Sequence, residues 1–212
     1  FFDEDVPCEP KWGNWFKSYT EFQAGFAKIA EEAKVDLFIP GCEMVMSEHR
    51  EEEWRKLISD LRDVYKGPIT YNTDKYQEHN VKWWDALDYI SSSGYYPIDK
   101  WDTELDRIEK VVKKFDKPFI FAEAGCMSVK GSNMVPNNWA IRDESDLKGQ
   151  ADWYDTMFKA CEKRDWIKGM FLWAWCHKLY NPKDADKQLN YDVYSKPAGE
   201  VIRNFYDKKR LL

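Results

Sequence analysis

The 212-residue sequence predicts an α/β fold with a parallel sheet, and it favours a (β/α)8 barrel. Five short apolar runs alternate with amphipathic helices at separations of roughly 30 to 50 residues, as parallel βα units with right-handed crossovers require. No glycine-rich phosphate-binding turn follows any of these runs. The usual reason for an open, nucleotide-binding sheet is therefore missing, which favours the barrel.

The first half of the chain predicts helices that alternate with strands. Apolar residues recur at helical spacing within 19–30, and 35–40 (VDLFIP) has the composition of a buried strand. A second striped helix is predicted over 54–64, and the short run ITYN (69–72) follows it. The next predicted strand, 86–91, ends in the turn-prone sequence SSGYYP.

The second half repeats this order. An amphipathic helix is predicted over 105–115, and the apolar run FIFAEAG (119–125) follows a Lys–Pro break. A polar loop then leads to a helix over 150–161, the strand MFLWAW (170–175) and a final helix that starts at Pro197. Closing a barrel takes eight strands, whereas this pattern supplies five.

Composition limits the class of protein. A chain of this length predicts one domain over residues 1–212. The formal charge of −6 argues against a nucleic-acid partner, which would require a basic face, and no apolar run is long enough for a membrane span. The first residue is Phe1, so whether the protein is secreted or cytoplasmic stays open.

The cysteines and histidines predict no metal site and no disulfide framework. The five cysteines form an odd set without CxxC spacing, and the three histidines are scattered. We expect no cofactor. The cysteines are Cys8, Cys42, Cys126, Cys161 and Cys176.

Two glutamates stand where predicted strands end, Glu43 in IPGCEM and Glu123 in FAEAG. In a barrel, the carboxyl ends of the strands form the mouth of the active site. Two carboxyl groups in one cleft suit glycoside hydrolysis: one protonates the leaving oxygen, and the other attacks the anomeric carbon. A separation of about 5–5.5 Å would make the mechanism retaining. Taken alone, either glutamate is equally compatible with a salt bridge to a neighbouring strand.

Aromatic and amide side chains are predicted on the same rim. They are Asn72, Tyr95, Tyr96, Trp173 and Trp175. A hydroxyl group from one of the two tyrosines could keep Glu123 ionised, because a hydrogen bond to the charged form favours it. Strand alternation sends both tryptophans to one face, so either both line a sugar site or both pack in the core.

The motifs themselves resemble glycoside hydrolase family 113, whose members are endo-β-1,4-mannanases of the large clan A of retaining (β/α)8 hydrolases. The resemblance covers almost the whole chain. It is carried by PGCEM (40–44), TYNTDKYQEHNVKWWDALDYISSSGYYP (70–97), FAEAGCMS (121–128) and FLWAW (171–175).

In that clan the acid/base follows the fourth strand and the nucleophile follows the seventh. The resemblance therefore implies that Glu43 is the acid/base, that Glu123 is the nucleophile, and that Trp173 is the platform beneath the reacting sugar. It also implies that this chain covers strands 4–8 of a TIM barrel, with strands 1–3 in a missing segment or a second chain. One departure is Cys42, at a position where clan members commonly carry an Asn that contacts the sugar 2-hydroxyl.

The resulting hypothesis is a retaining hydrolase that cleaves β-1,4-mannan or manno-oligosaccharides. Asn72 is the candidate for hydroxyl contacts, and Trp12 and Trp15 join the stacking candidates because of their predicted loop position. The alternatives are the same mechanism on a galactan or glucan, a carbohydrate-binding protein without turnover, and a scaffold subunit completed by a partner chain. The stacking candidates are Trp12, Trp15, Tyr95, Tyr96, Trp173 and Trp175.

Overall fold

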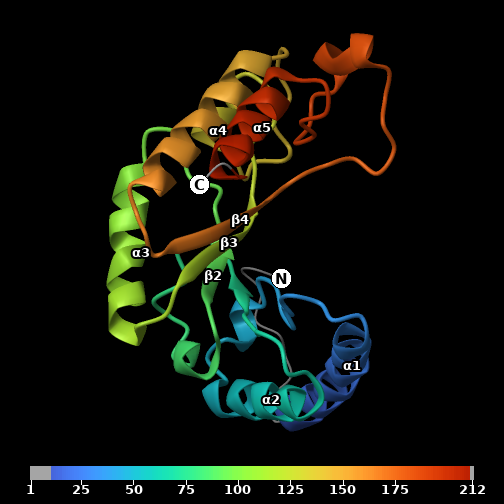
Figure 1. Cartoon of the computed structure of the whole chain (residues 1–212), viewed down its shortest axis with the longest axis vertical. Helices are drawn as coiled ribbons and strands as arrows, with labels where there is room; N and C mark the ends of the chain where they lie inside the picture. The colour runs from blue at the N-terminus through green and yellow to red at the C-terminus, as the bar shows by residue number, and fades with distance from the viewer. Residues whose placement is uncertain (1–10, 211–212) are drawn as a thin grey trace. The chain divides into compact units, whose positions relative to one another are not determined.

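The computed structural model describes residues 11–210, in which two α-helices are followed by two strands and then by α-helices and strands in alternation (Figure 1). The α-helices are α1 (Trp12–Glu32), α2 (Glu51–Val64), α3 (Trp101–Phe115), α4 (Leu147–Glu162) and α5 (Pro197–Arg210). The strands are β1 (Asn72–Thr73), β2 (Ile90–Ser93), β3 (Phe119–Ala124) and β4 (Ile167–Leu172). All five predicted helices are therefore confirmed.

The strands of residues 11–210 form one sheet in the order β1-β2-β3-β4. Strands β1 and β2 pair in parallel, with Asn72 opposite Ser91 and Thr73 opposite Ser92. The α/β class with parallel strand pairing is thus confirmed. The described residues hold four strands where the sequence predicted five, and β1 and β4 lie at the two ends of the order.

The missing fifth strand is the segment 35–40, which was predicted as a buried strand. It makes one parallel bridge, between Phe38 and Ile69, and belongs to none of the four strands. A second isolated bridge joins Cys42 to the segment that becomes β1. Pro40 lies between the two bridges, and its missing N–H interrupts a ladder of hydrogen bonds. The segment is extended, but it pairs at only these points.

Three predicted strands differ from the observed ones in their limits. Pairing in the 69–72 run begins as an isolated bridge, and β1 starts at Asn72. The strand predicted at 86–91 is β2, which begins later because a 3-10 turn occupies Trp84–Ala86. Strand β4 ends at Leu172, so the tryptophans of the MFLWAW run lie beyond it.

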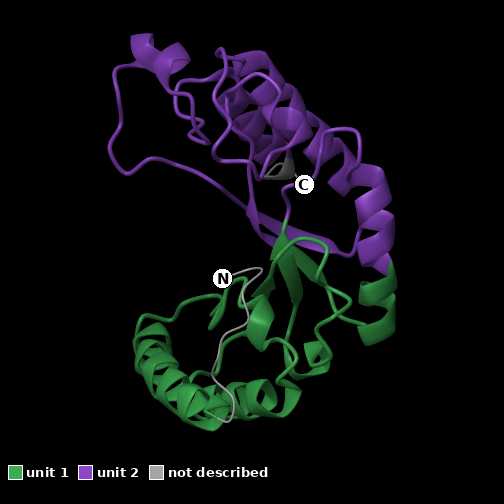
Figure 2. Cartoon of the chain, turned by 180° about the vertical axis from the view of Figure 1, so that it is seen from behind, with its two compact units in different colours: residues 1–93, 110–120 green, residues 94–109, 121–212 purple. Residues whose placement is uncertain are grey.

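The chain divides into two compact units (Figure 2). The first comprises Phe1–Ser93 and Lys110–Ile120, and the second comprises Gly94–Glu109 and Phe121–Leu212.

Aromatic side chains form the core of the first unit. Trp54 of α2 is fully buried and stacks on Trp83, with ring centroids 4.9 Å apart and planes at 12°. Tyr71 contacts both rings, at 5.0 and 4.9 Å between centroids. Helix α1 packs on the same cluster through Phe16 and Tyr19, whose rings meet the edge of Trp54. Burial of these large rings is the main stabilising contribution of the unit.

The second unit has its own aromatic core. Trp101 of α3 meets Phe121 of β3 and Trp153 of α4 edge to face, at centroid distances of 5.6 and 5.3 Å. Helices α4 and α5 lie side by side, and Phe158 stacks on Phe205 at 4.0 Å (Figure 1). These contacts join α3 to the strand that carries Glu123, α4 to α3, and α5 to α4.

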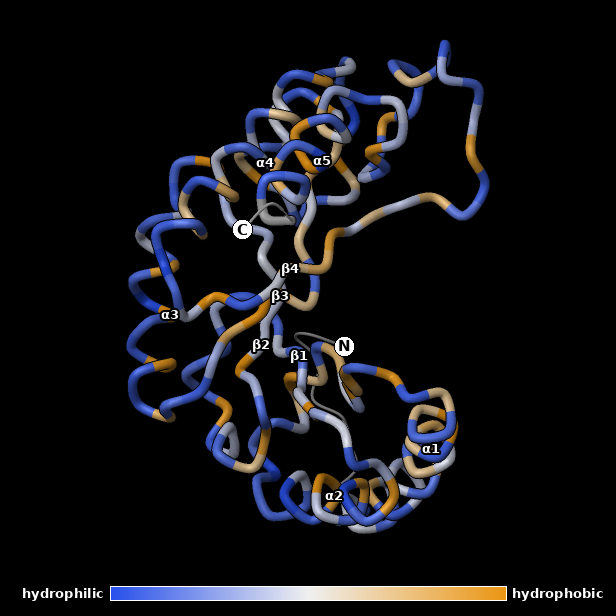
Figure 3. The backbone as a smooth tube through the Cα atoms, viewed as in Figure 1, coloured by the Kyte–Doolittle hydropathy of each residue, from blue (hydrophilic) through white to orange (hydrophobic). Residues whose placement is uncertain are grey.

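The helices are amphipathic. Apolar and polar residues alternate around the turns of α2 and α3 (Figure 3), which is the pattern of helices with one buried face. None of the helices within residues 11–210 is long and apolar enough to cross a membrane.

Gly41 is predicted to be essential to the first core. A Cβ atom there would lie 2.9 Å from both the Trp54 ring and the Tyr71 ring, too close for either buried side chain. We expect Gly41→Ala to lower the free energy of unfolding by about 1–3 kcal/mol, the usual cost of overpacking. Urea unfolding measures the change. The control is Gly25→Ala, at an open position of α1, which should raise stability by about 1 kcal/mol. A neutral Gly41→Ala would contradict the packing argument.

Candidate active site

Glu43 occupies an unusual turn at the end of the extended segment in the first unit. It follows Cys42, which forms a parallel bridge with Asn72, and its φ angle is +52°. The left-handed region is uncommon for residues other than glycine and needs support from the surrounding structure. One support is the Glu43 amide, which donates to the Asn72 carbonyl oxygen at 2.7 Å.

The carboxyl group of Glu43 is half-buried and is held by a short chain of polar groups. The Ser93 hydroxyl at the end of β2 donates to Glu43 Oε1. The Asn72 side-chain amide donates to the same hydroxyl at 3.1 Å and lies 3.2 Å from Cys42 Sγ, which accepts from it. The carboxyl ends of the extended segment, β1 and β2 therefore meet at Glu43 within this unit.

A second set of contacts holds the residue after Glu43. The Tyr71 hydroxyl accepts a hydrogen bond from the Met44 amide at 2.9 Å and donates to Glu48 Oε1 at 2.8 Å. Thr73 donates to the same oxygen at 2.6 Å. Sequence analysis missed Glu48, because it lies in the charged stretch SEHREEE, which is typical of a solvent-exposed helix start.

Glu48 is a buried carboxyl group. Its exposed fraction is 4%, and its Oε2 atom has no hydrogen-bond partner among the described residues. The pKa of Glu48 is raised to about 7, chiefly by burial and in smaller part by the nearby Asp74 and Glu78. The two hydroxyl donors lower it, but by less than burial raises it. Glu48 is therefore neutral in acid and becomes charged near neutral pH.

Glu123 lies in the second unit, near the end of β3. Its side chain is half-buried, and the Tyr95 hydroxyl donates to Oε1. The main chain is fixed as well, because the Gly94 amide donates to the Glu123 carbonyl oxygen at 2.6 Å. The prediction that a tyrosine of the SSGYYP turn would bind Glu123 is confirmed for Tyr95. It is a suitable group, because a phenolic O–H can orient a carboxylate from one side.

Two exposed tryptophans follow β4 in the same unit. Trp173 is 52% exposed, and its amide donates to the Ala124 carbonyl oxygen at 2.7 Å, next to Glu123 in the chain. Gly125 makes this approach feasible, since a Cβ atom there would lie 2.1 Å from the Trp173 carbonyl oxygen. Trp175 is 64% exposed and meets Tyr194 edge to face. Both indole rings therefore present open apolar surface.

Four residues predicted to contact a sugar have buried side chains, and one of them is Tyr95, 8% exposed, already described beside Glu123. Trp12 is 2% exposed and, with Trp15, lies on helix α1 rather than in a loop. Tyr96 has no exposed surface and packs on Trp101, while Asn72 is 2% exposed and uses its amide inside the protein. Their rings and amide are covered by neighbours, which favours structural roles for them. Trp15 is half-buried and stacks on a tyrosine of its own helix.

A buried lysine ties down the segment that follows Glu123. Lys196 is 2% exposed, and its Nζ donates to Ser128 Oγ at 2.9 Å and to the Gln188 carbonyl oxygen at 2.6 Å. Burial lowers its pKa to about 8, against the opposing effect of Asp192. Sequence analysis missed this group, since nothing in the local pattern distinguishes Lys196 from a surface lysine.

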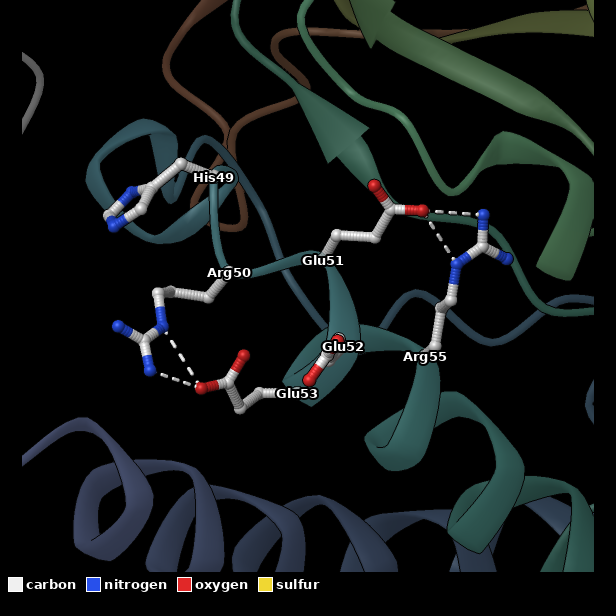
Figure 4. Close-up of a pocket in the computed structure, with 6 residues that line it drawn as sticks. All are labelled: His49, Arg50, Glu51, Glu52, Glu53 and Arg55. Carbon is white, nitrogen blue, oxygen red and sulfur yellow. Dashed lines mark hydrogen bonds and ion pairs between the residues drawn. The ribbon is translucent and has the colours of Figure 1, made fainter.

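Other parts of the described chain do not offer a competing centre. Within residues 11–210, no three His, Cys, Asp or Glu side chains gather so that they could hold a metal ion. A surface hollow at the start of α2 is rich in charge, but its arginines are paired with glutamates (Figure 4). Arg50 binds Glu53, and Arg55 binds Glu51 at 2.8 Å. Each arginine of this hollow is thus paired with a glutamate.

Comparison with known proteins places the chain among carbohydrate-active enzymes. Residues 1–196 match Glycoside Hydrolase Family 113. Solved structures of a family 113 β-1,4-mannanase are 54% identical, with a TM-score of 0.91, and the match covers 98% of this chain and 67% of theirs. A family 113 β-mannanase from Alicyclobacillus acidocaldarius is 37% identical over the same shares, with a TM-score of 0.89.

More distant structures share only the fold. The β-glucuronidase of Faecalibacterium prausnitzii is 15% identical, with a TM-score of 0.69, over 91% of this chain and 35% of that one. A search of curated proteins gave no match.

The ionisation of Glu48 predicts a pH-dependent stability. Its pKa in the folded protein is about 7, above its ordinary value of 4.5, so the folded state binds the proton more tightly than the unfolded state does. The free energy of unfolding should therefore fall as pH rises from 4.5 to 7, by an upper limit of about 3 kcal/mol. Urea unfolding of the parent and of Glu48→Gln at pH 5 and pH 8 tests this. In Glu48→Gln, the difference in the free energy of unfolding between the two pH values should be much smaller than in the parent. The same difference in both proteins would refute the role of Glu48.

Proposed function

The chain belongs to glycoside hydrolase family 113, and we propose that it cleaves β-1,4-mannosidic bonds with Glu43 as acid/base and Glu123 as nucleophile. As a member of the family it is a glycoside hydrolase. The observation that carries the substrate class is the 54% identity to a β-1,4-mannanase across 98% of the chain. The substrate is accordingly β-mannan or manno-oligosaccharides.

The proposed reaction is a double displacement. Protonated Glu43 gives its proton to the glycosidic oxygen while ionised Glu123 attacks the anomeric carbon, so that the leaving sugar departs and a covalent glycosyl-enzyme forms. Glu43, now ionised, removes a proton from water, and this water releases the sugar from Glu123 with net retention. A retaining mechanism requires the two carboxyl groups about 5–5.5 Å apart across one bond. Side chains alone supply both the proton transfer and the nucleophile.

The local surroundings of each glutamate support its role. Glu43 is half-buried with one oxygen held by Ser93, an arrangement that restrains a proton donor without enclosing it. Glu123 receives the Tyr95 hydroxyl at one oxygen, and a donor of this kind can orient the carboxyl group for attack. In place of a sugar contact for Asn72, we propose that its amide orients the Ser93 hydroxyl.

Exposed aromatic rings supply the proposed sugar surface. Trp173 and Trp175 present the open indole faces of the second unit, and a sugar ring can lay its C–H side on such a face. We propose Trp173 as the platform beneath the reacting sugar. The half-buried Trp15 stays a proposed contact of the first unit.

We also propose that residues 1–212 form one catalytic domain, corresponding to strands 4–8 of a (β/α)8 barrel. In this assignment 35–40 is strand four, and β1 to β4 are strands five to eight. Strands one to three would come from a further segment or a second chain. Two observations support this assignment. The match covers only 67% of the related mannanase chain, and β4 lies at the end of the sheet order.

The roles of the two glutamates predict different losses. With β-mannan as substrate, Glu43→Gln should lower kcat by about 10²- to 10⁴-fold, the usual effect of losing a general acid. Aryl β-mannotriosides separate the roles, because a dinitrophenyl leaving group departs without a proton whereas a phenyl group needs one. Glu43→Gln should spare kcat/KM for release of dinitrophenol, which reports the first step, while kcat still falls because Glu43 also activates the water of the second step. Glu123→Gln should abolish cleavage of both substrates. Phenol and reducing-sugar release measure the rates.

The exposed carboxylate Glu21 on α1 serves as the control, and Glu21→Gln should match the parent. Equal losses on the two aryl substrates for Glu43→Gln would contradict its role as acid. A folded parent chain that binds manno-oligosaccharides without releasing reducing sugar would favour the carbohydrate-binding alternative. Release from galactan or glucan in preference to mannan would overturn the substrate class.

Tyr95→Phe is expected to weaken the nucleophile. Removing the hydroxyl leaves the carboxyl oxygen of Glu123 without this donor, so kcat on the dinitrophenyl substrate should fall by about 10-fold, in line with the loss of one charge-assisted hydrogen bond of about 1.5–3 kcal/mol. Stopped-flow release of dinitrophenol measures the attack step directly. An unchanged attack rate would show that the bond is structural only.

A further inference from the structure

We propose that Glu48 and Tyr71 are positioning residues that aim the acid/base Glu43 at the glycosidic oxygen. The proposal rests on the catalytic role proposed above for Glu43. Neither residue is proposed to touch the substrate, since both are buried in the first unit, with exposed fractions of 4% and 0%. They act through the backbone on which Glu43 is mounted.

The first step of the argument is the turn at Glu43. Its φ angle of +52° is a conformation that a side-chain-bearing residue adopts only when other contacts enforce it. The peptide before its Cα is held by the hydrogen bond from the Glu43 amide to the Asn72 carbonyl oxygen, at 2.7 Å. The peptide after it is held by the hydrogen bond from the Met44 amide to the Tyr71 hydroxyl, at 2.9 Å. Together these two bonds restrain both backbone dihedrals, and so the direction in which the side chain leaves.

The second step concerns the rigidity of Tyr71. Its ring packs against both members of the Trp54–Trp83 stack, with centroids 5.0 and 4.9 Å away, and Gly41 leaves the space that the ring occupies. A ring held on several sides keeps its hydroxyl oxygen at one place. The Tyr71 hydroxyl that binds the Met44 amide is therefore held in place by the aromatic core, whereas a group on the surface would be mobile.

The third step is the orientation of the hydroxyl group. A tyrosine hydroxyl has one proton, and here it is directed to Glu48 Oε1 at 2.8 Å. With the proton committed in that direction, an oxygen lone pair is left for the Met44 amide. The Thr73 hydroxyl also donates to Glu48 Oε1, at 2.6 Å, which fixes the acceptor in turn. By accepting the Tyr71 proton, Glu48 thus makes the Tyr71 hydroxyl oxygen an acceptor for the Met44 amide.

The burial of Glu48 also needs a reason. An unpartnered carboxyl oxygen in the interior costs free energy, and Glu48 Oε2 is such an atom within the described chain. An apolar side chain of similar size would avoid that cost. It would, however, leave the Tyr71 and Thr73 hydroxyl protons without their acceptor, and Tyr71 would be free to turn its proton toward the Met44 amide. A role in positioning Glu43 explains why residue 48 is a buried carboxyl group and not an apolar side chain.

Placement matters because a proton donor works only within hydrogen-bond reach of the leaving oxygen. A shift of about 1 Å in a catalytic group can cost on the order of 10²-fold in rate. A loosened turn should therefore impair the step that needs Glu43 as an acid. Attack by Glu123 should be spared when the leaving group requires no proton.

The test compares phenyl and dinitrophenyl β-mannotriosides with Tyr71→Phe, which deletes one oxygen atom. We expect kcat/KM on the phenyl substrate to fall by about 10-fold or more, as for a displaced general acid, with the dinitrophenyl substrate changed by less than about 2-fold. The second pair of variants bears on Glu48. Glu48→Leu removes the acceptor and should reproduce this selectivity, whereas Glu48→Gln keeps an acceptor oxygen and should restore the parent ratio.

A matched control separates positioning from stability. Tyr65 is another buried tyrosine of the first unit, 2% exposed, and its hydroxyl donates to the Val35 carbonyl oxygen at 2.5 Å. Tyr65→Phe therefore loses the same atom and a comparable bond to the backbone, far along the chain from Glu43. It should lower the melting temperature without changing the ratio of the two substrates.

The outcomes distinguish this proposal from the one on which it rests. If Glu43→Gln is selective for the dinitrophenyl substrate but Tyr71→Phe and Glu48→Leu are not, the positioning role is overturned and the catalytic assignment stands. If Glu43→Gln is not selective, the proposed acid/base role itself fails. Equal losses on both substrates in Tyr71→Phe and Tyr65→Phe would mean that the Tyr71 contact is structural only.

Discussion

The hydrogen bond between the Met44 amide and the Tyr71 hydroxyl joins the core of the first unit to its candidate catalytic residue. In our proposal the turn at Glu43 depends on this contact together with the bond from the Glu43 amide to the Asn72 carbonyl oxygen, because a left-handed turn at a glutamate is not self-supporting. The bond is reliable only if the Tyr71 ring does not move, and Trp54 and Trp83 provide that restraint. The aromatic core thus has a chemical consequence in addition to its contribution to stability.

The tryptophans of the chain have two roles. The chain has eleven tryptophans, whose flat rings suit the C–H faces of sugars. Five of them are instead among the largest fully buried side chains of the described structure. Trp173 and Trp175 keep open faces, and they follow the strand that ends beside the Glu123 segment. The tryptophans therefore serve both as packing that holds the site and as surface that can meet a substrate.

The two glutamates are supported by different means in their own units. Glu43 depends on buried groups behind the turn, among them a carboxyl group whose pKa is raised to about 7 by burial. Glu123 lies in a regular strand, receives the Tyr95 hydroxyl directly, and is followed by a segment that the buried Lys196 holds through Ser128. A strand already fixes the direction of a side chain, so Glu123 needs no special turn.

The sequence by itself determined the five helices, strand β3 and the choice of Glu43 and Glu123 as candidates. Helical periodicity, helix-breaking residues and a carboxylate at the end of an apolar run are local properties that can be read from neighbouring residues. Only the tertiary structure decided that 35–40 forms a single bridge, that Trp12, Asn72 and Tyr96 are covered, and that Glu48 lies beneath the site. Burial and pairing depend on residues distant in the chain, and a charged stretch such as SEHREEE does not reveal which of its members turns inward.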